Sequence, residues 1–241
     1  AYTTGCRENT EIVLYRTEEW FKVFVHETFH NFGLDFSEMN LHNVNKKLRN
    51  IFNVNVEFNL YESYCEFWAR TINCMMYSYL QLQPKHNLHY ETFQNTFKQN
   101  MKQECQYSLF QALKILDFMG LGYKTIAKKN DKTDIDSIHV CNYLYKENTS
   151  VFSYYIITSM LMNNYNDFMS WCLNNNTIFL QFKKTPGNLE AYIDFISNCC
   201  KNTHIKKNIN IIEKSLSKTG DSLSRSLRMT QLDLDTVIHS D

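Results

Sequence analysis

The chain has 241 residues, a formal net charge of zero and 44% hydrophobic residues, which suits one globular domain or two closely packed lobes with a sizeable core. Its lysines and arginines are spread out, apart from short pairs at 128–129 and 206–207, so no nucleic-acid partner is expected. The longest apolar stretch, residues 151–173, is interrupted by asparagines and an aspartate, so no membrane span is expected.

Cysteine, glycine and proline usage bounds the fold class and the compartment. The 8 cysteines form no Cys-x-x-Cys pair, and several lie on apolar faces of expected helices, which indicates free thiols in the cytoplasm or another reducing intracellular compartment. Because the chain begins with Ala1, an upstream segment could have been removed, and the N-terminus does not settle localisation. With 6 glycines and 2 prolines, we expect a mainly α (α+β) fold whose helices are joined by Asn-rich turns.

The first predicted elements are a short strand and an amphipathic helix. Residues 11–16 are β-prone, and the helix is expected to begin near Thr17, with Glu18 and Glu19 suited to its first turn. Gly33 is a predicted C-cap. The apolar residues of the helix recur at helical spacing: Trp20, Phe21, Phe24, Val25, Phe29 and Phe32.

Within this helix lies the sequence H-E-x-x-H, formed by His26, Glu27 and His30. Residues four apart on a helix share a face, roughly 5–6 Å from one another, which suits two imidazole ligands of one tetrahedral zinc ion. Glu27 points to a neighbouring part of that face, where its carboxylate can reach a water on the metal without ligating the metal.

This motif resembles that of the zincins, a family of zinc metallopeptidases. The resemblance implies a Zn²⁺ cofactor, a peptide or protein substrate, and a zincin-like helical domain in which the strand at 11–16 lies along the cleft. The metzincin branch extends the motif to H-E-x-x-H-x-x-G-x-x-H/D, which fits as far as Gly33. Its next ligand position is Phe36, which cannot bind metal, and Asp35 is off by one.

The second informative stretch follows a helix predicted over residues 37–51, with Ser37 as its N-cap, and an extended piece at 54–58. A further helix from Asn59 to Tyr79 places Glu62 and Glu66 on one face among large apolar residues. Lone carboxylates there would be costly, so both need a metal or another partner. The alternative is an exposed polar stripe with both carboxylates in water.

The sequence around Glu62 resembles the Glu-rich ligand helix of gluzincins, and of lethal-factor-like peptidases in particular. By this resemblance Glu62 is the third zinc ligand, and Glu66 hydrogen-bonds a zinc-bound histidine. The two roles could also be exchanged. With two histidines and one glutamate as ligands, the metal keeps a fourth position for water, and Glu27 acts as general base and then as general acid.

The rest of the chain is expected to be mostly helical. Helices are predicted over 90–119, 134–147, 150–173 and 187–200, with a short strand at 177–182. We divide the chain into a zincin catalytic core (1–83), a helical lower lobe (84–214) and a flexible tail (215–241).

The sequence therefore predicts a zinc metallopeptidase, a hydrolase with His26, His30 and Glu62 as ligands. The resemblance to zincins also implies a tyrosine or histidine of the lower lobe that donates a hydrogen bond to the oxyanion, and nothing in the sequence selects among Tyr123, His139, Tyr154 and Tyr155. Two alternatives are a catalytically inactive zincin-like scaffold and a helical protein-interaction module without metal.

Overall fold

A computed structural model describes residues 1–5, 9–15, 17–83, 89–127, 135–216 and 226–238. It confirms the prediction of a mainly α fold with a small β element, since the one sheet in the described part pairs β1 (Tyr2–Thr3) antiparallel to β2 (Ile12–Val13). The helices are α1 (Trp20–Asn31), α2 (His42–Leu48), α3 (Leu60–Leu82), α4 (Tyr90–Phe118), α5 (Tyr123–Ile126), α6 (Ile135–Leu144), the π-helix η2 (Phe152–Ile157), α7 (Thr158–Asn163), α8 (Tyr165–Asn175), α9 (Pro186–Lys201), α10 (Thr203–Leu216) and α11 (Asp235–Ile238).

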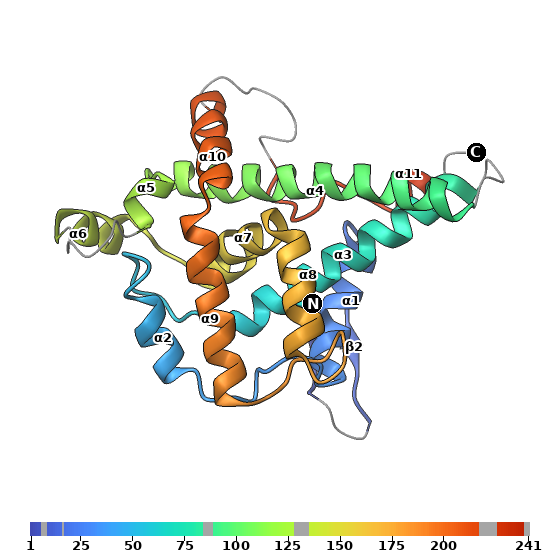
Figure 1. Ribbon diagram of the computed structural model, residues 1–241, viewed down its shortest axis with the longest axis horizontal. Coiled ribbons are helices and arrows are strands. Elements are labelled where there is room, and N and C mark those ends of the chain that lie inside the picture. The colour runs from blue at the N-terminus through green and yellow to red at the C-terminus, as the bar shows by residue number, and fades with distance from the viewer. Residues whose placement is uncertain (6–8, 16, 84–88, 128–134, 217–225, 239–241) are drawn as a thin grey trace.

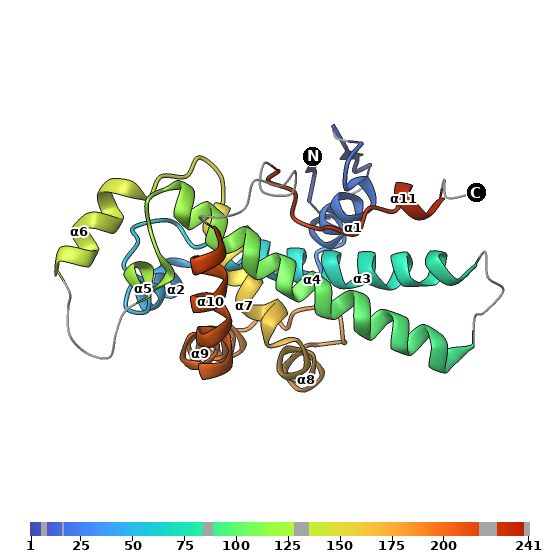
Figure 2. The ribbon, with the colours of Figure 1, turned by 90° about the horizontal axis from the view of Figure 1, so that it is seen from above.

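Helix α3 is the central element of the structure. It runs beside the long helix α4, with α1 packed on one side and α7, α8 and α9 on the other (Figures 1 and 2). Helix η2 also packs against α3 and α4. The first turns of α3 therefore face α1 and η2 at the same time, which places Glu62 where three elements meet.

Helix α1 ends in a Schellman motif, which confirms the cap expected at Gly33. Gly33 has φ 61°, its N–H donates to the His30 carbonyl at 3.0 Å, and the Leu34 N–H donates to the Phe29 carbonyl at 2.9 Å. The helix begins at Trp20 rather than near Thr17, after Glu19 in a left-handed conformation. The chain thus turns back sharply at Gly33, just beyond the end of α1.

Two short elements differ from the sequence prediction. The strand expected at 11–16 is reduced to Ile12–Val13, because β1 is its one partner in the described part and is itself two residues long. Helix α2 begins at His42, and Ser37 does not cap it: the Ser37 N–H and hydroxyl donate to Asp35 Oδ1 instead. Local side-chain hydrogen bonding has here outweighed the capping preference of serine.

The predicted helix over 150–173 is divided. It begins as η2, continues as α7 and bends at Asn164 into α8, where the Asn164 side chain donates to the Met160 carbonyl at 2.8 Å. The strand expected at 177–182 is a single bridge between Ile178 and Gln181. The helices predicted over 90–119, 134–147 and 187–200 are present as α4, α6 and α9.

The expected tail at 215–241 has three parts. Leu216 is the last residue of α10, residues 217–225 and 239–241 lie outside the described residues, and residues 226–238 pack against the helices. The described cysteines, all seven of them, are free thiols. Within the described ranges, no helix is both long and apolar enough to cross a bilayer.

An aromatic core lies beneath α3. The ring of Phe36 lies 4.2 Å from that of Phe182 and also contacts the rings of Tyr64 and Tyr192. The Tyr64 hydroxyl donates to the Leu180 carbonyl at 2.9 Å, so its polar end is satisfied inside the core. This cluster joins the loop after α1 to α3, α9 and the loop before α9.

We expect Phe36→Ala to lower the free energy of unfolding by about 3–5 kcal/mol, because the side chain is 0% exposed and leaves a cavity. Phe118 is 90% exposed, so Phe118→Ala should stay within about 0.5 kcal/mol of the starting protein. Denaturant unfolding followed by circular dichroism measures both. Equal losses for the two variants would contradict this assignment of the core.

Candidate metal centre

Helices α1 and α3 bring three candidate ligand atoms to one point. His26 Nε2 lies 3.1 Å from His30 Nε2 and 3.1 Å from Glu62 Oε2, and His30 Nε2 lies 3.3 Å from Glu62 Oε2. Ligand atoms of a tetrahedral zinc ion, each about 2.1 Å from the metal, are roughly 3.4 Å apart. The triangle therefore has the size and the donor atoms that one zinc ion requires.

This centre lies near the surface but is largely shielded from water. The side chains of His26, His30 and Glu62 are 8%, 17% and 14% exposed. Both histidines project from the face of α1 that packs on α3, and Glu62 projects from the first turn of α3. His30 and Glu62 are the more exposed of the three side chains.

Glu66 lies on the other side of the His26 ring. Its Oε2 is 3.2 Å from His26 Nδ1, an ion-pair distance without the alignment of a hydrogen bond, so Nδ1 has no hydrogen-bond partner among the described residues. Both Glu66 oxygens accept from Lys22 Nζ, at 3.1 and 3.2 Å. In this arrangement Glu62 is the carboxylate beside the two Nε2 atoms, and Glu66 faces Nδ1 and Lys22.

Asp35 faces the other imidazole, and the sequence analysis did not assign it this place. Asp35 Oδ2 is hydrogen-bonded to His30 Nδ1, and Oδ1 accepts from the Ser37 N–H and hydroxyl at 3.1 and 2.9 Å. The signal was an acidic residue shortly after the Gly33 cap, because a Schellman turn brings the chain back over the last helical turn. Each imidazole thus has a carboxylate at Nδ1, as is usual for metal-binding histidines.

A second group, His30, Asp35 and Cys65, is also close together. Its atoms are already engaged with one another, since Asp35 Oδ2 bonds His30 Nδ1 and the Cys65 thiol lies 3.6 Å from the same oxygen. Burial raises the pKa of the Cys65 thiol, which disfavours the thiolate that a metal ligand requires. The group is better suited to orient His30 than to hold an ion.

The charges at the centre favour a cation. Burial by itself would raise the pKa of Glu62, but hydrogen bonds to His26 and His30 outweigh it and lower the pKa to about 2. Burial by itself would lower the pKa of both imidazoles. The neighbouring carboxylates raise it by more, so both pKa values lie above the ordinary value of histidine. Three carboxylates and one ammonium surround the imidazoles, so the carboxylates favour positive charge on them, and a divalent cation in place of the imidazole protons would supply that charge.

Two further residues, Glu27 and Tyr154, are candidates for the chemistry at this site. Glu27 is half-buried, and its carboxylate has no hydrogen-bond or ion-pair partner among the described residues. The Tyr154 ring, on η2, is 5.7 Å from the His26 ring. Burial, and after it Glu62, raises the pKa of the Tyr154 hydroxyl, which therefore keeps its proton. π-helical turns occur often at functional sites because they shift the direction of a side chain.

The other tyrosine and histidine candidates are placed elsewhere. The Tyr155 hydroxyl donates to the Leu227 carbonyl at 2.6 Å, and Tyr123 is buried beside α10, where its N–H donates to Glu213 Oε1. His139 is on α6, at the far end of the molecule from α1 (Figures 1 and 2). Tyr154 is the candidate that the fold brings to the metal centre.

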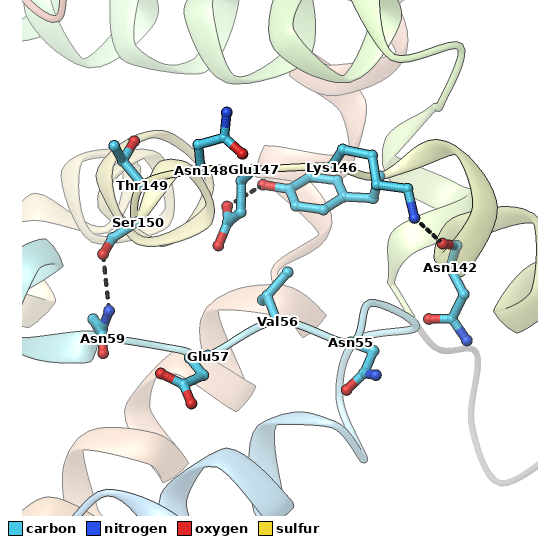
Figure 3. Close-up of a pocket in the computed structure, with 11 residues that line it drawn as sticks. Asn55, Val56, Glu57, Asn59, Asn142, Lys146, Glu147, Asn148, Thr149 and Ser150 are labelled. Atoms are coloured by element: carbon cyan, nitrogen blue, oxygen red, sulfur yellow. Dashed lines mark hydrogen bonds between the residues drawn. The ribbon is translucent and has the colours of Figure 1, made fainter.

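A polar cavity of about 700 Å³ lies between segments 55–59 and 142–150 (Figure 3). The two walls meet where Asn59 Nδ2 donates to Ser150 Oγ at 2.9 Å. The Glu62 N–H in turn donates to the Asn59 carbonyl at 3.0 Å, and the Tyr154 N–H to the Ser150 carbonyl at 2.9 Å. Asn59 and Ser150, at one end of the cavity, are thus a single helical turn before Glu62 and Tyr154 respectively.

The metzincin alternative has no support in these positions. Phe36, its third ligand position, is 0% exposed in the aromatic core, and Asp35 faces Nδ1 of His30 rather than the shared point of the Nε2 atoms. Comparisons of the chain with protein-family models, curated proteins and solved structures find no match.

For the zinc-loaded protein, we expect Glu62→Ala to lose the metal and Asp35→Ala to weaken zinc affinity by roughly ten- to a hundredfold. The control is Glu38→Ala, whose exposed carboxylate binds Lys184 at the surface and should have no effect. Competition with a chromophoric chelator measures all three affinities. Unchanged affinity in Glu62→Ala would remove that residue from the ligand set.

Proposed function

We propose that this protein is a zinc-dependent metallopeptidase that holds Zn²⁺ with His26, His30 and Glu62 and hydrolyses peptide bonds. The observation that supports it most is the triangle of two imidazole nitrogens and one carboxylate oxygen with sides of 3.1, 3.1 and 3.3 Å. Two nitrogens and one oxygen leave the fourth position of a tetrahedral ion free, as catalytic zinc sites do.

The chain supplies the acid–base chemistry through Glu27. A bound zinc ion would supply an acidified water and polarise the scissile carbonyl. Glu27 directly follows His26 in the chain, is half-buried, and has no described partner for its carboxylate. It would take a proton from the attacking water and then deliver that proton to the leaving amine.

Tyr154 is the group proposed to stabilise the oxyanion that forms when water adds to the carbonyl. Its ring lies beside His26, and its raised pKa keeps the hydroxyl protonated, so it can donate a hydrogen bond to a developing negative charge. The neighbouring Tyr155 is already bonded to the Leu227 carbonyl.

The polar cavity of Figure 3 is proposed to hold the substrate chain beside the scissile bond. An extended peptide advances about 3.3 Å per residue, so a few residues reach from the metal centre into this cavity. Glu57 is exposed on its wall, with no described ion-pair partner, whereas Lys146 Nζ donates to the Asn142 carbonyl. A basic side chain of the substrate would be favoured near Glu57.

A catalytically inactive zincin-like scaffold is the second candidate. The observation that favours it is the sheet, whose two strands are two residues each and offer a short edge to a substrate backbone. A chain that binds one zinc ion but leaves a broad peptide library uncleaved would support the scaffold. A chain that binds no zinc after mild purification would support a helical interaction module.

We expect Glu27→Gln to keep zinc and to lower cleavage by about 10²- to 10⁴-fold, because the amide cannot accept the proton of the water. His30→Ala should lose both zinc and cleavage. The control Glu18→Gln changes an exposed carboxylate before α1 and should retain both. Peptide-library cleavage and metal analysis test the three variants; wild-type rates in Glu27→Gln would rule out the mechanism.

For peptides with a basic side chain that enters the cavity, we expect Glu57→Ala to raise KM roughly two- to fivefold with little change in kcat. An exposed ion pair is worth up to about 1 kcal/mol, and its loss affects ground state and transition state equally. Glu190→Ala is the control, since Glu190 pairs with Lys47 on a separate surface. Steady-state kinetics with matched basic and neutral peptides checks the effect, and a uniform change for both would argue against it.

A further inference from the structure

Residues 226–238, here called the C-terminal strap, cross α1, α3 and α4 as an extended segment ending in α11 (Figures 1 and 2). The helices hold it by its main chain. The Thr230 N–H donates to Glu19 Oε1 at 2.7 Å, and Asn73 Nδ2 donates to the Leu232 carbonyl at 2.9 Å. Thr230, Leu232 and Leu234 are buried, so these three residues of the strap belong to the interior.

The strap supports Glu19, the residue directly before α1. Glu19 has φ 61° and is buried, although a residue other than glycine in this region costs roughly 1–2 kcal/mol. Such a conformation persists only where its surroundings hold it. The bond from the Thr230 N–H to the Glu19 carboxylate is that support, and it sets where the helix of the H-E-x-x-H motif begins.

The strap also covers Lys22, one turn further along α1. Lys22 is buried, and its Nζ lies 3.2 Å from Met229 Sδ while it binds both oxygens of Glu66. Glu66 in turn faces His26 Nδ1 at 3.2 Å. A continuous line of contacts therefore runs from the strap through Lys22 and Glu66 to a metal-facing imidazole.

The same segment closes a layer of buried charges between α3 and α4. Arg70 donates to Glu104 Oε1 at 2.8 and 2.6 Å, and the Gln231 N–H donates to Glu104 Oε2 at 3.3 Å. Buried charges are tolerated only with their partners in place. The strap excludes water from this layer, and its N–H groups supply some of the missing hydrogen bonds.

We propose that the C-terminal strap is a positioning element of the metal centre, which holds α1 at Glu19 and Lys22 and thereby fixes Glu66 against His26. This inference rests on the zinc site of the proposed function. The strap lies on the Nδ1 side of His26, whereas the three ligand atoms gather on the Nε2 side. It therefore supports the site from behind rather than covering its open face.

The test compares variants in the full chain. Glu19→Ala and Leu232→Asp should each weaken zinc affinity roughly tenfold, the lower end of what a change behind a metal-binding histidine costs, because Glu66 would no longer be fixed beside His26. Both should also lose amide hydrogen-exchange protection over residues 20–26 in the metal-free protein. Glu19→Gln keeps an acceptor oxygen for the Thr230 N–H and should restore both readouts.

The matched control is Thr236→Ala. Thr236 is exposed, and its hydroxyl donates to the Asp233 carbonyl within the strap at 2.6 Å, so both readouts should stay at wild-type values. The proposal is overturned if Glu19→Ala and Leu232→Asp remain folded with unchanged affinity and unchanged exchange. It is also overturned if they cleave faster at unchanged affinity, because the strap would then be inhibitory.

The exchange measurement separates this proposal from the proposed function. If the wild-type chain binds no zinc, the metallopeptidase proposal fails, and exchange at residues 20–26 alone decides whether the strap holds α1. If zinc binds and the strap variants leave α1 protection unchanged, the strap proposal fails while the metal site stands.

Discussion

Two carboxylates on one face of α3 determine how the site is built. Glu62 and Glu66 lie where α3 packs on α1, and a carboxylate removed from water is unstable unless a cation or several donors compensate it. Helix α1 supplies His26 and His30 to Glu62, and Lys22 to Glu66. The contacts that pack the two helices together are therefore also the contacts that compensate the charges. They place the Nε2 atoms of His26 and His30 and one carboxylate oxygen of Glu62 at a common point.

The parts of this arrangement that depend on the spacing of residues along one helix, or on its cap, could be predicted from sequence. The spacing of His26 and His30, the cap at Gly33 and the shared face of Glu62 and Glu66 each depend on residues within one or two helical turns, and the structure has all of them. The place of Asp35 follows from the turn at Gly33 rather than from a helical period, and the strap could not be predicted at all in this way. The contact of Thr230 with Glu19 spans 211 residues, and one N–H donating to one carboxylate leaves no periodic pattern in either segment.

The choice among the tyrosines depends on the backbone of η2. Tyr154 and Tyr155 are neighbours in sequence with the same chemistry, yet one ring lies beside His26 and the other hydroxyl is bonded to the Leu227 carbonyl. Aromatic patterning predicted a helix there and could not give its π-helical turn, which changes the angle between successive side chains. The strand before α1 is shorter than predicted for another reason. A strand forms only over the length of its partner, and its partner β1 has two residues.

The buried ion pairs next to the site bear on why the strap is there. A buried pair such as Arg70 and Glu104 contributes little net stability, because desolvation offsets the attraction, and well-packed apolar side chains often do as well or better. Stability alone thus gives no reason to place five charged groups, Glu19, Lys22, Glu66, Arg70 and Glu104, between three helices. Unlike apolar side chains, each charged group pairs only with a group of opposite charge placed in a suitable direction. In the role proposed for the strap, a layer of them closed by its main-chain N–H groups would restrict the orientation of the His26 ring, and a ring held in that way would bind a metal ion without first losing rotational freedom.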